Sequence, residues 1–150
     1  MPFIFMWAAI LLFGLLFGIE MDTGKVMKTR TVMQGGADAA TLAGAMQNHQ
    51  VVTKTDGSGA PVEFDFVLNT NSSPEDAAIQ TWEKNKANWT SNVGQGTTPY
   101  LGRTSDQKGV TLQVLQTVDN TITQNVTNTL FKKPIQSEIN VPVRSVSKIP

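Results

Sequence analysis

The hydrophobic pattern begins with an unbroken apolar run from Phe3 to Ile19 that contains no charged residue. A membrane-spanning helix needs ~20 apolar residues, so this run is long enough to cross a bilayer with little tilt. No proline or other helix stop follows before Asn48, and a glycine costs only about 1 kcal/mol relative to alanine in a helix. We therefore expect one continuous helix over residues 1–48, apolar in its first half.

Small residues recur at four-residue spacing in two parts of this helix. Gly14 and Gly18 form a GxxxG motif, and Gly36, Ala40 and Gly44 form a second ladder. Residues four apart share a helix face, so this spacing lets another helix backbone approach closely. We expect these residues to form an assembly interface. For the first motif the alternative is that glycine is simply common in transmembrane helices.

Two carboxylates, Glu20 and Asp22, follow the apolar run, and three cations, Lys25, Lys28 and Arg30, come next. One interpretation is an ordinary membrane-exit segment in which Asp22 and Lys25 pair at i,i+3. The other is that Glu20 and Asp22 meet cations of neighbouring copies inside a helix bundle, because carboxylates beside a low-dielectric region are costly unless paired. The pattern favours the first interpretation and leaves the second open.

Three stretches after residue 48 alternate apolar and polar residues, as half-buried strands do: 62–68, 110–118 and 135–146. A helix is predicted to start with Ser73 as its N-cap and Pro74 at its first position, and to end near Asn88. A turn is expected within 51–61, at the turn-forming cluster 54–59. The polar segment 90–107 is predicted to be the longest loop and the most exposed surface.

Another helix is predicted over 121–131, with Ile122, Val126 and Leu130 on its apolar side. Trp82 and Trp89 share a side of the helix at 73–88, and we expect them to cover the sheet; carbohydrate stacking is the functional alternative.

The order of elements predicts an α+β fold in which a long, pilin-like hydrophobic helix precedes a small α+β head with an antiparallel sheet. The expected domains are the transmembrane and assembly helix at 1–48 and the globular head at 49–150. We expect the head to share no contacts with the helix at the depth of Gly14 and Gly18.

The first part of the chain resembles the TadE/TadG-like proteins of tight-adherence pili. Members of that family carry an apolar helix, a D-x-G sequence just after it, and a Q-x-A-A-D-A-A-A-L-A-G-A block further on. Asp22-Thr23-Gly24 and the segment Gln34 to Ala45 match these positions, with Gly35, Gly36 and Thr41 as departures. The resemblance covers roughly residues 1–48.

This resemblance implies a pilus or cell-envelope role. Its implied partners are copies of the same chain in a helical polymer, or other pilus subunits, with the membrane as the environment before assembly. Pilins proper carry a glutamate five residues into the mature helix, whereas position 5 here is Phe5. The resemblance therefore favours the TadG-like branch or a divergent subunit.

Composition excludes several kinds of chemistry. The chain has 150 residues, no cysteine, one histidine (His49) and zero formal net charge, so thiolate and paired-histidine sites are absent and no basic patch favours nucleic acid. No phosphate-binding glycine loop occurs, and we predict no catalytic residue, no metal site and no cofactor. Asn71, Asn88 and Asn125 head N-x-S/T sequons, which are possible glycosylation sites.

The N-terminus allows two interpretations. A cleaved signal peptide normally has a basic start and an A-x-A-like cleavage site, and neither is present, so we favour a retained helix. The basic residues follow the apolar run, which would keep the remainder of the chain in the cytoplasm. Either the topology is unusual or this N-terminus is the product of removing a basic leader.

The leading functional hypothesis is a structural, non-enzymatic subunit of a surface filament or pilus, with its helix bundled inside, its head outside and a use in adhesion. It would be a single-pass membrane protein before assembly and extracellular afterwards. The alternative is a single-pass, membrane-anchored envelope protein whose head binds a ligand or partner without polymerising. A secreted domain with a cleaved signal is a third hypothesis.

Overall fold

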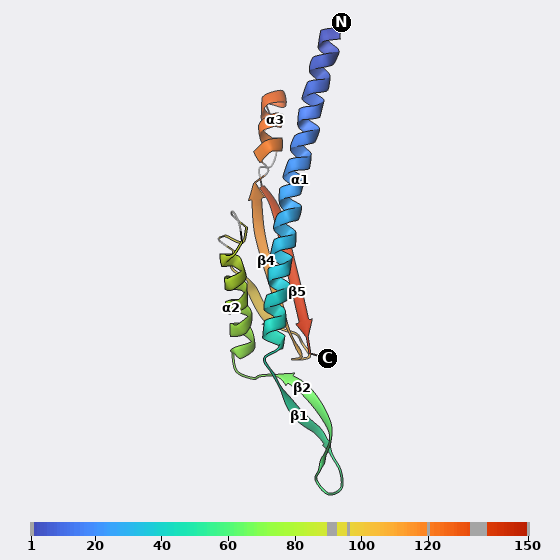
Figure 1. Ribbon diagram of the computed structural model, residues 1–150, viewed down its shortest axis with the longest axis vertical. Coiled ribbons are helices and arrows are strands. Elements are labelled where there is room, and N and C mark those ends of the chain that lie inside the picture. Colours follow the sequence, from blue (N-terminus) through green and yellow to red (C-terminus); the bar gives the residue numbers. More distant parts are fainter. Residues whose placement is uncertain (1, 90–92, 96, 120, 133–137, 150) are drawn as a thin grey trace. The chain divides into compact units, whose positions relative to one another are not determined.

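The structure is a computed structural model that describes the chain except residues 1, 90–92, 96, 120, 133–137 and 150 (Figure 1). Contacts between Cα atoms divide the chain into two compact units. The first unit comprises Met1–Thr31 and Gln116–Val141, and the second comprises Val32–Leu115 and Pro142–Pro150. Each unit is described below by itself.

The N-terminal helix α1 extends from Pro2 to Ala45, a length of 44 residues. It forms because the sequence offers no interior proline, and glycines lower helix propensity without forbidding a helix, even at the adjacent Gly35 and Gly36. The predicted long helix is therefore confirmed. Its N-terminal part belongs to the first unit, and its part from Val32 onward belongs to the second.

The second unit contains a two-stranded antiparallel hairpin of β1 (Asn48–Thr55) and β2 (Pro61–Leu68), in which Val52 pairs with Phe64. The turn lies where it was predicted, because the Asp56 carboxylate accepts hydrogen bonds from the Ser58 and Ala60 amides, each at 2.9 Å. Strand β1 was not predicted: its polar residues show no alternation, and pairing with β2 defines it. Apolar side chains remain exposed on this hairpin, namely Val52, Val62, Phe64 and Phe66.

Helix α2 runs from Ser73 to Ala87, close to the prediction. The N-cap, however, is Ser72 rather than Ser73, and no side-chain hydrogen bond caps the helix there. The Ser73 hydroxyl instead donates to Asn71 Oδ1 at 2.7 Å, and Ser72 donates to Asp76 Oδ2 at 2.8 Å. The predicted cap was wrong by one residue because two adjacent serines offer similar side chains.

A three-stranded sheet has the order β3-β4-β5, with β3 at Tyr100–Arg103, β4 at Gly109–Asp119 and β5 at Glu138–Lys148. Strand β3 pairs antiparallel with β4, and the arrows of β4 and β5 also point in opposite directions (Figure 1). The loop predicted at 90–107 is thus wrong over β3, and its predicted exposure is wrong at Val93 and Thr97, which are buried. Residues 90–92 and 96 of this segment lie outside the described residues. Residues 133–137, where the last strand was predicted to begin, lie outside the described residues.

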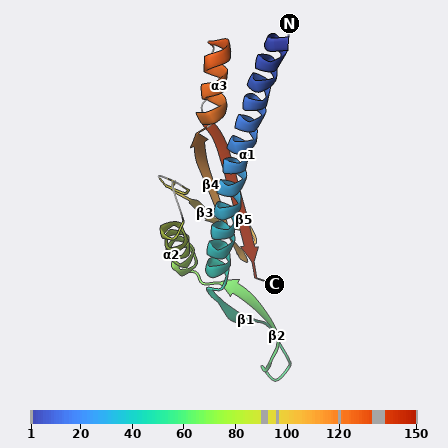
Figure 2. The ribbon, with the colours of Figure 1, turned by 45° about the horizontal axis from the view of Figure 1, so that its top comes forward.

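The core of the second unit forms where α1, α2 and the sheet meet (Figures 1 and 2). Trp82 is completely buried, and its ring meets that of Trp89 edge to face at a centroid distance of 5.0 Å, which supports the predicted covering role. Helix α1 contributes a small-residue face that lets the bulky indole and strand side chains approach it. The buried residues of this cluster are Met33, Ala37, Ala40, Trp82, Val93, Leu112, Val114 and Val143.

The first unit is built from the first 31 residues and the segment around α3 (Thr121–Phe131). Helix α3 is amphipathic as predicted, because Ile122, Val126 and Leu130 recur at four-residue spacing. Its Thr127 hydroxyl donates back to the carbonyl of Thr123 at 2.8 Å, so even this buried polar side chain is satisfied within the helix.

Candidate assembly interface

Most side chains in the apolar half of α1 are exposed to solvent in the isolated chain. Phe13 is 77% exposed and Phe3 is 72% exposed, values that a soluble protein core would not allow. In the part of the chain that the structure describes, α1 is the one helix that is long and apolar enough to cross a membrane. The other large apolar side chains exposed on it are Ile4, Phe5, Met6, Trp7, Ile10, Leu11, Leu12, Leu16, Phe17 and Ile19.

One face of this apolar half is covered by α3. A Cβ atom placed at Gly18 would lie 3.1 Å from Ile122 Cγ2, so the missing side chain allows α3 to approach closely. This contact contradicts the prediction that the head shares nothing with the helix at this depth. The prediction failed because α3, late in the sequence, packs in the same unit as the N-terminal residues.

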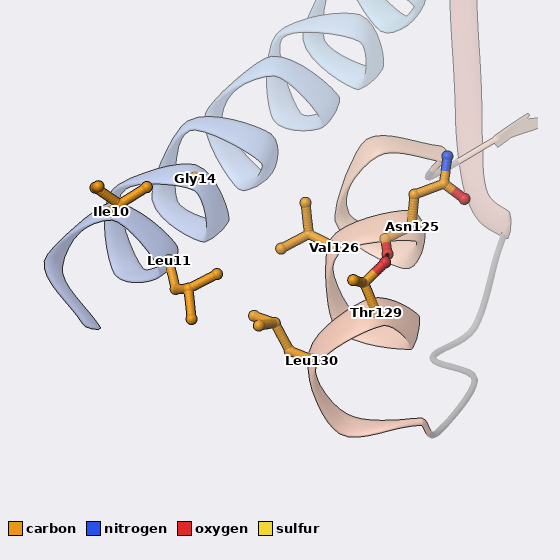
Figure 3. A pocket seen from close by; sticks show the side chains of 7 residues that line it. All are labelled: Ile10, Leu11, Gly14, Asn125, Val126, Thr129 and Leu130. Atoms are coloured by element: carbon orange, nitrogen blue, oxygen red, sulfur yellow. Dashed lines mark hydrogen bonds between the residues drawn. The ribbon is translucent and has the colours of Figure 1, made fainter. Parts of the chain in front are cut away.

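Two grooves flank the contact between α1 and α3, with volumes of about 390 and 320 Å3. Leu11 and Leu130 line both grooves, and Figure 3 shows Leu11 facing Val126 and Leu130. The remaining lining residues are Ile10, Gly14, Asn125, Val126 and Thr129 in the first groove, and Ala8, Leu12 and Leu15 in the second.

The carboxylate of Asp22 lies at the start of α3. Asp22 is 3% exposed, its Oδ2 accepts a hydrogen bond from the Thr123 amide at 2.7 Å, and its Oδ1 lies 3.3 Å from Lys25 Nζ. The first amides of a helix lack intrahelical acceptors, and the positive end of the helix dipole favours a carboxylate there. Asp22 therefore acts as an N-terminal cap that α1 supplies to α3.

The other two predicted residues in this part of α1 are placed differently. Glu20 is exposed, and a Cβ atom placed at Gly14 would meet nothing within 4 Å. The structure thus brings Gly18 and Asp22 together against α3, whereas Gly14 lines the groove beside α3 and Glu20 is exposed. Their role between copies of the chain stays a prediction.

The second small-residue ladder packs inside the chain. A Cβ atom at Gly36 would clash with the Trp89 ring, and one at Gly44 would lie 2.7 Å from the carbonyl oxygen of Pro74. Ala40 is fully buried. Packing within the second unit is thus sufficient to explain why these positions are small, and an assembly role for them also stays a prediction.

A polar network joins α1 to β5 beside this ladder. The Thr41 hydroxyl lies 2.9 Å from the hydroxyls of both Ser145 and Ser147, and Ser145 donates to Asp38 Oδ1 at 2.6 Å. Gln34 donates to the same carboxylate oxygen at 2.8 Å. Buried polar groups need such partners, so this network fixes the position of α1 on the strand.

An arginine that the sequence analysis did not single out joins β3 to α2. Arg103 donates to both carboxylate oxygens of Glu75, at 2.6 and 3.0 Å, and to the carbonyl oxygens of Asn69 and Asn71, at 2.8 and 2.6 Å. These bonds hold the pKa of Glu75 below its ordinary value, although partial burial opposes the shift. No local pattern could have predicted a pair that is 28 residues apart.

The three sequon asparagines occupy different settings. The Asn71 side chain accepts from Ser73, and the Asn88 side chain donates to the carbonyl of Lys84 at 3.0 Å. Asn125 is exposed, but the Thr127 of its sequon is buried. Since a sequon must be accessible to be modified, the folded chain disfavours the site at Asn125, and the use of all three stays a prediction.

His49, the one histidine of the chain, lies near the start of β1. The His49 ring is exposed, and its Nδ1 lies 2.9 Å from Asn69 Oδ1. Among the residues that the structure describes, no group of three or more histidines, cysteines or acids is placed to hold a metal ion.

Residues 1–47 match a family model described as "Tad: Putative Flp pilus-assembly TadE/G-like". This match confirms the resemblance over the helix α1, and it associates the chain with pilus assembly at the level of that description. It ends just after α1, so it does not extend over the strands or the later helices. No curated protein matches the chain. No solved structure matches it either.

Proposed function

We propose that the chain is a structural subunit of a pilus or related surface filament that assembles through α1. The strongest support is that the TadE/G-like match covers α1, and the apolar half of this helix is exposed to solvent. Burying an apolar side chain contributes about 1.5–3 kcal/mol, so a row of exposed phenylalanines requires lipid or other protein chains around it.

In this proposal the membrane surrounds the apolar half before assembly, and other copies of the chain or other pilus subunits surround it afterwards. Gly14 lines the first groove, where an added Cβ atom would meet nothing within 4 Å, and a second α1 would come closest there. The remainder of the chain, residues 49–150, forms the head on the outside and serves adhesion. The role is mechanical, with no catalytic step and no nucleic-acid partner.

The test is to express the tagged full chain with a Tad secretion apparatus and to shear filaments from the cells. We expect the chain in the sheared fraction with residues 3–19 intact by N-terminal sequencing. Replacing Gly14 with leucine should reduce the filament yield, whereas the same change at Gly35, also in open space but outside the apolar run, should not. Loss of residues 3–19 from the filament, or equal yields, contradicts this function.

The second candidate is a membrane-anchored envelope protein that does not polymerise. It is supported by the contact of α3 with α1, since part of the helix surface is already covered by the chain itself. It predicts that the chain stays in the membrane fraction while filaments form without it. A chain that is secreted after loss of residues 3–19 would instead match the cleaved-signal hypothesis.

A further inference from the structure

Helix α3 lies along the part of α1 that would be inside a membrane. Its first turn contacts Gly18 through Ile122, and its last turn lines a groove with Ala8 and Leu11 through Leu130. All three α1 residues belong to the apolar run of residues 3–19. If this run crosses a bilayer, docked α3 therefore lies at the depth of the hydrocarbon core.

The outward side of α3 is unsuited to hydrocarbon. Asn128 is exposed there, and the exposed Lys132 follows directly after the helix; Asn125 is also exposed and lines the groove beside α1. Polar and charged side chains within a membrane face other protein or water, because contact with lipid leaves them without hydrogen-bond partners. The docked α3 would present these groups to lipid.

We propose that the α1 face formed by Leu11, Leu15 and Gly18 binds either α3 or the lipid of a bilayer, and that insertion of α1 requires α3 to leave it. The inference rests on the membrane anchoring included in the proposed function, and it does not depend on polymerisation. Helix α3 is then a cover that docks when α1 is outside the bilayer.

The contact between α1 and α3 is small enough for α3 to leave α1. The apolar part of the contact includes Ile122, Val126 and Leu130 of α3, and two grooves adjoin it. When α3 leaves, Asp22 loses the Thr123 amide but keeps Lys25, which is 3.3 Å away. The carboxylate is therefore not left without a partner at the end of the apolar run.

The test is a disulfide that locks α3 in place. The chain has no cysteine, so Gly18→Cys together with Ile122→Cys creates a single pair. A Cβ atom at Gly18 lies 3.1 Å from Ile122 Cγ2, which puts the two Cβ atoms near the separation of about 3.5–4.5 Å that a disulfide needs. The full chain is synthesised in a cell-free system without lipid or detergent, oxidised, mixed with phosphatidylcholine vesicles and extracted at alkaline pH.

The matched control is Thr41→Cys with Ser145→Cys, at two hydroxyls 2.9 Å apart in the second unit. We expect the 18–122 bridge to lower the membrane-retained fraction about tenfold, reductant to restore it, and the control bridge to leave it unchanged. Equal retention with and without the 18–122 bridge, equal loss with both bridges, or no 18–122 bridge at all overturns the inference. If the reduced chain also fails to insert, membrane anchoring itself fails.

Discussion

The Asp22 carboxylate accepts a hydrogen bond from the Thr123 amide at 2.7 Å, although the two residues are 101 positions apart in the sequence. This bond joins the end of the apolar run in α1 to the first turn of α3. It gives a structural role to the aspartate of the D-x-G sequence that lies within the matched region. The remaining Asp22 oxygen faces Lys25, so one carboxylate satisfies a helix N-terminus and a cation together.

The first prediction follows from this bond. Replacing Asp22 with alanine removes the acceptor of a helix-terminal amide, a change that costs about 0.5–2 kcal/mol at N-caps. We expect faster hydrogen exchange of the α3 amides in the full chain prepared without lipid or detergent. Asparagine at this position keeps an oxygen acceptor and should give a smaller effect.

The control for this prediction is Glu20→Gln, which alters a carboxylate that is exposed. It should leave the exchange of α3 unchanged. If Asp22→Ala also leaves it unchanged, the carboxylate does not hold α3, and the contact depends on the apolar side chains alone.

The second prediction compares two helical glycines. At Gly44 an added methyl group would meet the Pro74 carbonyl at 2.7 Å and Val110 Cγ2 at 3.1 Å, whereas at Gly35 it would meet nothing within 4 Å. Alanine gains about 1 kcal/mol of helix propensity at either site, but overpacking at Gly44 costs about 1–3 kcal/mol. We therefore expect Gly35→Ala to raise the urea midpoint, measured by tryptophan fluorescence, and Gly44→Ala to lower it relative to Gly35→Ala. Identical midpoints would show that α1 does not approach α2 this closely.

The third prediction concerns pH. The hydrogen bonds and charge of Arg103 hold the pKa of Glu75 below its ordinary value of 4.5. A carboxylate with a lowered folded-state pKa stabilises the fold above its ordinary pKa, and this contribution is lost as pH falls through the lowered value. Glu75→Gln should therefore destabilise the chain by about 1–3 kcal/mol at pH 7, and the difference from wild type should shrink below pH 4.5.

The comparison for Glu75 is Glu83→Gln, because Glu83 forms an exposed pair with Lys86 on the same helix. Exposed pairs contribute little, so this variant should follow the wild-type unfolding curve at every pH. A Glu75→Gln deficit that stays constant from pH 7 to pH 3 would rule out titration of Glu75 as its source.

The fourth prediction concerns the polar network between α1 and β5. Thr41→Ala removes a hydroxyl that lies 2.9 Å from both Ser145 and Ser147 and should cost about 0.5–1.5 kcal/mol per lost bond. Thr41→Ser keeps the hydroxyl and should recover most of this stability in urea unfolding. Equal loss in both variants would assign the effect to the missing methyl group instead.

The sequence by itself determined the helices and strands that a local pattern of residues defines. The apolar run and the lack of a helix stop predicted α1, and periodicity predicted α3 and β4, because one buried face repeats at a fixed spacing along each of them. The residues 22–24 and 34–45 were also sufficient for the TadE/G-like resemblance, which the match over residues 1–47 confirmed.

Only the tertiary structure decided what each face contacts. Strands β1 and β3 exist through pairing with β2 and β4, and their own residues carry little periodicity. Gly18 and Gly36 looked alike in the sequence, yet one meets Ile122 and the other Trp89. Spacing along a helix reports which residues share a face, whereas the partner of that face depends on chain segments up to a hundred residues away, which local periodicity does not encode.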